Sequence, residues 1–208
     1  MTTTTTAHVP EPQQGFRPRE YAHTVLRTTQ PKALIDWYGK VLGLQVVLDH
    51  PMIKFLTWDD SQDRLAVIPV QDAVAPPPNA TGLDHTAFTV ASLKELTDQY
   101  RALKAQGILP LRCMNHGVAT SMYYLDPDGN MIELTVEAFA STAQTNAWLA
   151  TGAFDANPAG ALIDPEELCA RVDSGEPEEQ ILTPHPQHAE LLHEFVEAVR
   201  KERRGSSR

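Results

Sequence analysis

The chain has 208 residues, with 17 Lys and Arg against 27 Asp and Glu, so its formal net charge is −10. This acidic balance excludes a general nucleic-acid binder, which needs a basic surface to displace counterions, and also excludes docking on anionic lipid. No apolar run reaches the roughly 20 residues that span a bilayer. The 42% of hydrophobic residues suffices for a packed core.

Residues 1–17 are predicted to form a flexible N-terminal tail. The threonine tract at its start has no basic residues and no apolar stretch, so it does not match a secretory signal. Cys113 and Cys169 lie far apart in the sequence and match neither a disulfide framework nor a CxxC zinc spacing. We therefore expect two reduced thiols in a cytoplasmic protein.

The organisation of the chain is a duplicated module. Residues 21–24 read YAHT and residues 83–86 read LDHT, and each histidine is followed by a β-like run and then a helical pattern. The first helix is expected to begin at Pro31 and to stop at Gly43. Its apolar residues recur at helical spacing, at Ala33, Leu34, Trp37, Tyr38, Val41 and Leu42.

The second helix begins with a capping-box pattern, Ser92 followed by Glu95, and is expected to end at Gly107. The residues that mark its apolar side are Leu93, Leu96, Tyr100, Leu103 and Leu109.

Each helix is followed by three strand-like runs, at 44–49, 53–58 and 64–70 in the first half and at 108–114, 120–126 and 130–136 in the second. Turn-forming residues at 59–63 and 126–129 separate the last two runs of each half. The modules therefore span residues 21–70 and 83–137 and each reads β-α-β-β-β. Three consecutive prolines within residues 73–82 exclude a helix or central strand in the linker.

The predicted fold class is α+β. Modules of this size are too small to be stable alone, so we expect them to pair into one curved mixed sheet with the helices outside and a metal-binding cavity inside. This domain covers residues 18–140.

Residues 141–208 are expected to form a helical C-terminal extension. Asp164, followed by Pro165, is a strong helix start, and residues 188–203 show helical spacing. We favour packing of the extension on its own subunit over a dimer contact or a lid, with Trp148 and Phe154 as candidate anchors in each case. A homo-oligomer stays open.

Three residues with metal-ligand chemistry occupy related strand positions. His23 and His85 match between the modules, and Glu133 lies in the middle of an apolar strand, where a carboxylate is costly unless it is paired, protonated or metal-bound. Taken singly, a strand histidine is more often a hydrogen-bonded core residue, and a strand Glu an edge or salt-bridge residue. The first-module position that matches Glu133 falls at Ala66 or Val67, which cannot bind metal. Two His and one carboxylate leave coordination positions open, as in non-haem iron(II) oxygenases, and disfavour a closed four-ligand zinc site.

The paired modules, the AHT and DHT starts and the run NHGVATSMYYLDPDGNMIEL at residues 115–134 resemble the vicinal oxygen chelate superfamily. Within it, the chain is most similar to single-domain type I extradiol dioxygenases, relatives of catechol 2,3-dioxygenase and biphenyl-2,3-diol 1,2-dioxygenase. The resemblance implies that His23, His85 and Glu133 are the iron ligands. It also implies that Tyr123 hydrogen-bonds a substrate oxygen and that His116 lies near a histidine that borders the metal site in the family.

Ring-cleaving relatives usually also carry an acid/base histidine shortly before the second metal histidine, and residues 65–84 contain none. His116 or His50 could replace it. His116 could instead cap a loop, His50 could be a surface turn residue, and Tyr124 could take the place of Tyr123 if the register shifts by one. His185, His188 and His193 are interpreted as solvent-facing.

The resemblance thus implies an Fe(II)-dependent enzyme that cleaves a catechol ring with O2, with His116 as acid/base residue and Tyr123 orienting the substrate. The ligand set suits Mn(II) as well. Two alternatives stay open at this point. One is a metal-dependent lyase or isomerase of the glyoxalase or epimerase type, and the other is a metal-free drug-binding resistance protein.

Overall fold

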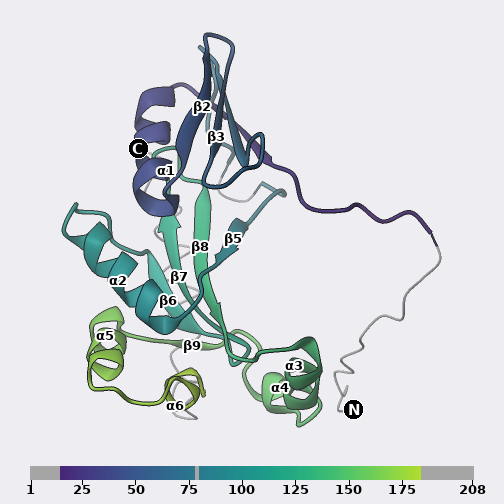
Figure 1. The fold of residues 1–208 in the computed structure, drawn as a ribbon, viewed down its shortest axis with the longest axis vertical. Helices are drawn as coiled ribbons and strands as arrows, with labels where there is room; N and C mark the ends of the chain where they lie inside the picture. The colour runs from purple at the N-terminus through teal and green to yellow at the C-terminus, as the bar shows by residue number, and fades with distance from the viewer. Residues whose placement is uncertain (1–14, 78–79, 184–208) are drawn as a thin grey trace. The chain divides into compact units, whose positions relative to one another are not determined.

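The structure, a computed structural model, describes residues 15–77 and 80–183 (Figure 1). Most of the predicted N-terminal tail and the helix expected over residues 188–203 lie outside the described residues. The described chain forms two compact units. Unit 1 contains His85–Tyr124 and residues 132–183, and unit 2 contains residues 15–77, 80–84 and Leu125–Met131.

Unit 2 contains the first module. Its elements are β1 (Thr24–Thr28), α1 (Pro31–Leu42), β2 (Gln45–His50), β3 (Ile53–Thr57) and β4 (Leu65–Pro69). The strand order in its sheet is β1-β4-β3-β2. The sheet is mixed, because β1 is parallel to β4 whereas β2, β3 and β4 run antiparallel.

Helix α1 begins and ends where the sequence predicts. Pro31 occupies the first turn, and Gly43 terminates the helix with φ of 68°, a left-handed conformation that glycine adopts without strain. The buried residues of the helix are Leu34, Trp37, Tyr38 and Val41, and α1 packs on β4. Ala33 fits the apolar spacing but is exposed, because it lies at the outer edge of the stripe formed by the buried residues of the helix.

The turn between the last two strands of the second module belongs to unit 2 and is held by the carboxylate of Asp126. Asp126 accepts hydrogen bonds from the backbone N–H groups of Asp128 and Asn130, at 2.9 and 2.8 Å. The hydroxyl of Tyr38 on α1 donates to the same carboxylate at 3.2 Å. Burial raises the pKa of Asp126. The turn predicted at residues 126–129 is thus confirmed.

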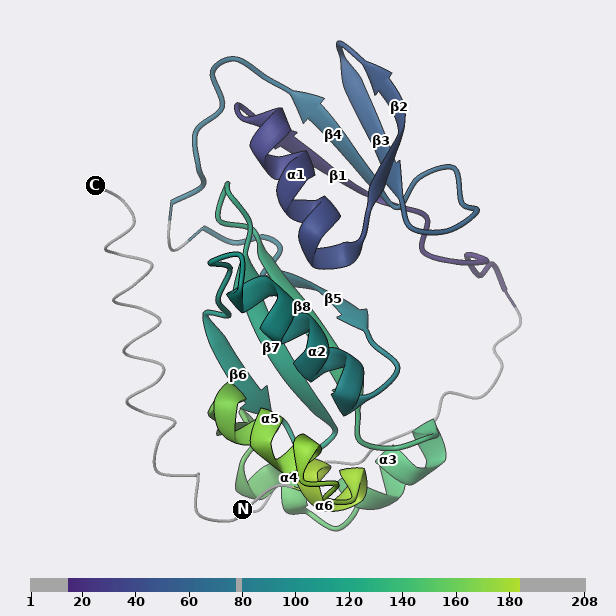
Figure 2. The ribbon, with the colours of Figure 1, turned by 60° about the vertical axis from the view of Figure 1, so that its left-hand side comes forward.

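Unit 1 contains the second module and the extension (Figure 1 and Figure 2). The module consists of β5 (His85–Thr89), α2 (Leu93–Lys104), β6 (Arg112–Asn115), β7 (Ala119–Leu125) and β8 (Met131–Glu137). The extension adds α3 (Thr142–Leu149), α4 (Ala153–Ala156), β9 (Ala161–Leu162), α5 (Pro165–Asp173) and α6 (Glu178–Leu182).

The strand order β5-β8-β7-β6-β9 repeats the order of unit 2 and adds β9 at the β6 edge. The predicted α+β class and the β-α-β-β-β modules are thus confirmed. Each module has its own sheet. The expected joining of the two sheets around a cavity concerns the arrangement of the two units and stays a prediction.

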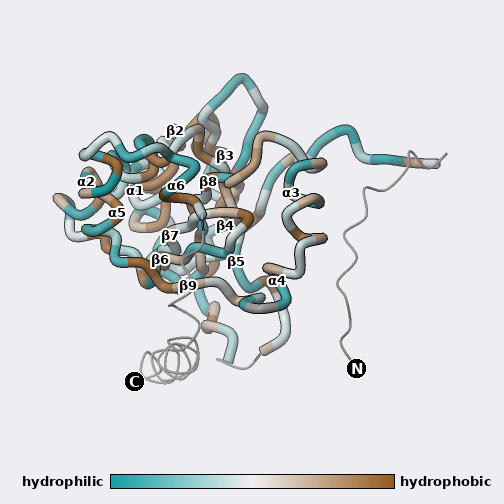
Figure 3. Tube along the Cα trace, turned by 90° about the horizontal axis from the view of Figure 1, so that it is seen from below, coloured by the Kyte–Doolittle hydropathy of each residue, from teal (hydrophilic) through white to brown (hydrophobic). Residues whose placement is uncertain are grey.

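Helix α2 is amphipathic, and its hydrophobic and hydrophilic residues alternate along the tube of Figure 3. The side-chain oxygen of Ser92 accepts a hydrogen bond from the Glu95 N–H at 3.1 Å, and the Glu95 carboxylate accepts one from the Ala91 N–H at 3.0 Å. Leu93, Leu96, Tyr100 and Leu103 are buried as predicted. Leu109 is 59% exposed, and its assignment to the apolar side is wrong because the helix ends at Lys104.

In the extension, the side chain of Asp164 accepts a hydrogen bond from the Glu166 N–H at 2.9 Å and begins α5, as the sequence predicts. The rings of Phe139 and Trp148 lie 6.1 Å apart. Of the helices in the described ranges, none is both long and apolar enough to cross a membrane.

Replacing Ser92 by Ala removes the acceptor for an otherwise unpaired N–H in the first turn of α2. We expect Ser92→Ala to lower the free energy of unfolding by about 1 kcal/mol, measured by urea unfolding. The control is Lys94→Ala, which changes a residue in the first turn of α2 and breaks its exposed ion pair with Asp98. This substitution should cost at most about 0.5 kcal/mol. Equal losses in the two variants would contradict the capping role.

Candidate functional site

The centre of the site is the carboxylate of Glu133, which lies in the middle of β8 and is 7% exposed. Its neighbours in β8 are buried apolar residues and one threonine. His85, the first residue of the adjacent strand β5, places its Nε2 atom 2.9 Å from Glu133 Oε2. Two of the three predicted metal ligands thus lie side by side in unit 1, on neighbouring strands.

Tyr123 supplies the second contact of this carboxylate. Its hydroxyl donates to Glu133 Oε1 at 2.8 Å, and burial, followed by the Glu133 hydrogen bond, raises the pKa of the phenol. Side chains alternate along a strand, so Tyr124 lies on the opposite face of β7, where its hydroxyl contacts Met122 Sδ at 3.6 Å. The structure therefore places Tyr123 rather than Tyr124 at Glu133.

His116 extends the network from the turn after β6. Its Nε2 lies 2.9 Å from the Tyr123 hydroxyl and its Nδ1 lies 3.1 Å from the carbonyl oxygen of Ala159 in the extension. A carbonyl only accepts, so Nδ1 carries a proton. Burial lowers the pKa of His116 and favours the neutral ring. Nε2 is then an acceptor, and the single hydroxyl proton of Tyr123 has two acceptors, Glu133 Oε1 and His116 Nε2.

Arg112 is a residue of this network that the sequence reasoning missed. It pairs with Tyr123 in the β6–β7 ladder, and its guanidinium carbon lies 4.3 Å from the centre of the Tyr123 ring. Such stacking is favourable because the ring face is electron-rich. The sequence does show that Arg112 is a charged residue in a predicted strand. That Tyr123 is its neighbour follows only from the register of β6 against β7.

The third predicted ligand, His23, directly precedes β1 in unit 2. Its Nδ1 lies 3.2 Å from Asp63 Oδ2, and the side chains are 43% and 11% exposed. The contact is an ion-pair distance and not a hydrogen bond, since Asp63 Oδ2 is buried without a hydrogen-bond partner among the described residues. Asp63 was not singled out in the sequence, because the turn at 59–63 contains three aspartates with no local mark to separate them.

Among residues 15–77 and 80–183, no group of three or more His, Cys, Asp or Glu side chains could together hold a metal ion. The predicted triad combines two residues of unit 1 with His23 of unit 2, so its closure stays a prediction.

The remaining candidate residues fall in different settings. The Nδ1 atom of His50 accepts a hydrogen bond from the Met52 N–H at 3.2 Å, in agreement with the surface-turn interpretation. Ala66 and Val67 are buried on β4 and provide no metal ligand. His185, His188 and His193 lie outside the described residues.

Comparison with known proteins identifies the family. A model of the Glyoxalase/Bleomycin resistance protein/Dioxygenase superfamily matches residues 20–134. Biphenyl-2,3-diol 1,2-dioxygenase 2 of Rhodococcus globerulus is 37% identical over 165 residues, which cover 79% of this chain and 87% of that protein. Biphenyl-2,3-diol 1,2-dioxygenase 3 of the same organism is 38% identical over 164 residues, 78% of this chain and 86% of that protein.

Solved structures show the same fold. A glyoxylase/bleomycin resistance protein/dioxygenase domain from Frankia sp. EAN1pec superimposes with a TM-score of 0.53 at 13% identity, over 62% of this chain and 99% of that one. A glyoxalase/dioxygenase from Nostoc punctiforme gives 0.50 at 19% identity, over 61% of this chain and 99% of that one. The chain therefore belongs to the Glyoxalase/Bleomycin resistance protein/Dioxygenase superfamily.

Proposed function

We propose that this chain is an extradiol dioxygenase that uses non-haem Fe(II) and O2 to cleave the aromatic ring of a catechol. The observation that carries the proposal is the network in which Tyr123 joins the Glu133 carboxylate, beside His85, to a half-buried histidine, His116. The two Rhodococcus relatives named biphenyl-2,3-diol 1,2-dioxygenase support the choice of substrate class.

The chemistry of the proposed donor set, two imidazoles and one carboxylate, fits a metal of this kind. His85 Nε2 and Glu133 Oε2 lie 2.9 Å apart, and the Glu133 side chain is only 10% exposed. The Asp63 carboxylate lies 3.2 Å from Nδ1 of His23, so Nε2 is the nitrogen that we assign to a ligand bond. Two imidazoles and a carboxylate suit Fe(II) and leave positions open for substrate. The chemistry that Fe(II) supplies when bound is electron transfer from the ring to oxygen.

The chain's own residues would handle the proton that a catechol loses on binding. With Nδ1 of His116 protonated and held by the Ala159 carbonyl, Nε2 is the basic atom and faces the Tyr123 hydroxyl. A general base needs its acceptor within hydrogen-bond reach of the proton, directly or through one water molecule. We assign His116 as that base and Tyr123 as the residue that orients a substrate oxygen.

A lyase or isomerase of the glyoxalase type has less support. In this family such enzymes usually use a further carboxylate from the first module, and the matching positions on β4 are buried Ala66 and Val67. A metal-free binding protein does not explain why a costly buried carboxylate lies beside an imidazole.

One prediction of the proposed function concerns the Glu133 carboxylate. After anaerobic loading with Fe(II), we expect the wild-type chain to consume oxygen with catechol or 2,3-dihydroxybiphenyl and to form a yellow ring-opened product. Glu133→Ala should lose both iron retention and turnover, because the carboxylate is a metal ligand. Glu137→Ala, at the exposed end of the same strand, is the matched control and should keep both.

The measurements are iron content after desalting, oxygen uptake and visible absorbance. Iron retention and turnover by Glu133→Ala would remove the site assignment. A wild-type chain that binds one iron but consumes no oxygen with either diol would contradict the proposed reaction.

Another prediction concerns Asp63, whose carboxylate oxygen lies 3.2 Å from Nδ1 of His23, whereas Nε2 is the nitrogen that would bind the metal. Asp63→Asn removes the charge that holds the ring, so we expect Fe(II) affinity to fall by roughly 10- to 100-fold. Asp60→Asn, in the same turn and exposed, makes the same change in net charge without a contact to His23. Metal titration under anaerobic conditions measures both variants, and equal affinities would show that Asp63 does not act through His23.

A further inference from the structure

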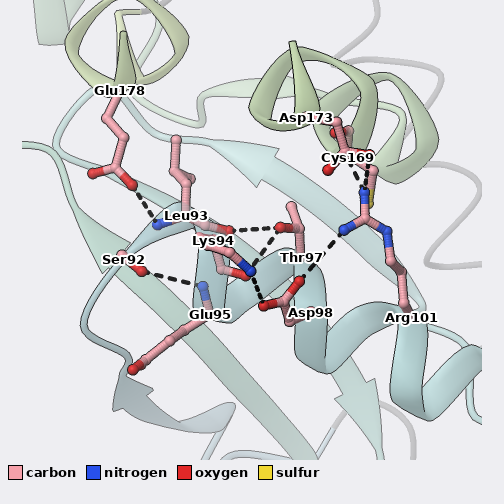
Figure 4. Close-up of polar contacts among 10 residues, drawn as sticks. All are labelled: Ser92, Leu93, Lys94, Glu95, Thr97, Asp98, Arg101, Cys169, Asp173 and Glu178. Carbon is pink, nitrogen blue, oxygen red and sulfur yellow. Dashed lines mark hydrogen bonds and ion pairs between the residues drawn. The ribbon is translucent and has the colours of Figure 1, made fainter. Parts of the chain in front are cut away.

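The C-terminal extension is fixed to helix α2 of the second module (Figure 4). Glu178 of α6 accepts a hydrogen bond at 3.0 Å from the N–H of Leu93, which lies in the first turn of α2 and lacks a helical partner. At the other end of α2, Arg101 contacts Asp173 at 2.6 Å and the Cys169 carbonyl at 3.4 Å. The extension is therefore anchored at both ends of this helix.

The same extension also holds the strand that leads to His116. Strand β9 pairs antiparallel with β6, and the Ile163 N–H donates to the Cys113 carbonyl at 3.1 Å. Asn115, the last residue of β6, joins the end of helix α6 to the turn that contains His116. Its amide nitrogen donates to the Leu182 carbonyl at 2.9 Å, and its amide oxygen accepts from the Gly117 N–H at 2.7 Å. The backbone on both sides of His116 is thus tied down.

The segment before β9 meets the imidazole itself. The Ala159 carbonyl accepts the Nδ1–H of His116 at 3.1 Å, and the following residue, Gly160, has φ of +85°. A Cβ atom at Gly160 would lie 2.5 Å from the Asn115 carbonyl oxygen and 2.9 Å from both Cα and Nδ1 of His116. Only glycine permits this approach, both for space and for backbone conformation.

We propose that residues 157–163 of the extension are a positioning element for His116. The Ala159 carbonyl fixes the ring orientation and its Nδ1–H tautomer, and Gly160 makes the contact sterically feasible. His116 Nε2 is thereby kept as the lone pair that faces Tyr123. The role of that lone pair as a base rests on the proposed function. If it holds, the extension is required for turnover but not for metal binding.

The alignment with a Rhodococcus dioxygenase includes part of the extension. Only 19 residues precede the family segment at 20–134, so an alignment of 165 residues must run well past its end. That relative therefore has a counterpart to part of the extension.

The test compares two glycines of the extension that share a left-handed backbone. In Gly160→Ala the new Cβ collides with His116, whereas Gly152, with φ of +79°, has no atom within 4 Å of an added Cβ. We expect Gly160→Ala to lower kcat by roughly 10²-fold, the usual loss when a general base is displaced, with Fe(II) affinity within about twofold of wild type. Gly152→Ala, which has the same backbone strain, should change neither.

A second readout follows the tautomer directly in full-length, metal-free chain with 15N-labelled histidine. Long-range 1H–15N spectra, assigned with His116→Gln, should show Nδ1–H at His116 in wild type and in Gly152→Ala, and a different tautomer or a mixture in Gly160→Ala. An Nε2–H tautomer in the wild-type chain overturns the proposal even if Gly160→Ala does not fold.

The proposal is also overturned if Gly160→Ala keeps both the tautomer and the kcat of wild type. A wild-type chain that turns over no catechol counts against the proposed function alone, because the tautomer comparison is independent of turnover.

Discussion

A buried carboxylate sets the main constraint on this structure. Glu133 lies in the middle of an apolar strand and is 7% exposed, and an ionised carboxylate in such a place is unstable unless polar groups compensate for the lost water. His85 and Tyr123 supply these groups from the two strands beside β8. The register of β5, β8 and β7 must therefore bring His85, Glu133 and Tyr123 together. A shift of one strand by one residue would turn its side chain to the other face of the sheet.

The compensation continues beyond the carboxylate. Each group in the series has a partner on the next element, from His85 on β5 through Glu133 and Tyr123 to His116, and the last partner is the backbone of the extension. Because the Tyr123 hydroxyl has one proton, it can donate to only one of its two neighbours, Glu133 Oε1 or His116 Nε2, at a time. The helices of the extension hold this backbone in place through contacts with α2.

Much of the local structure could be predicted because its causes are local. Pro31, Gly43 and the Ser92–Glu95 pair fix the helix ends through backbone conformation and capping, and Asp126 fixes its turn through its own backbone contacts. The error at Leu109 arose where a pattern was extended too far. Leu109 fits the helical spacing but follows the end of α2, and Ala33 fits the spacing but lies at the outer edge of the buried stripe.

The sequence by itself determined the duplicated module and the identity of the candidate ligands, because the first follows from repeat spacing and the second from side-chain chemistry at matching positions of the repeat. Tertiary structure alone decided which groups meet. Arg112 over Tyr123, Asp63 beside His23 and Ala159 against His116 join residues that are 11, 40 and 43 positions apart. Such contacts depend on strand register and on the path of the extension, and both are set by the packing of the whole unit rather than by any local preference of the chain.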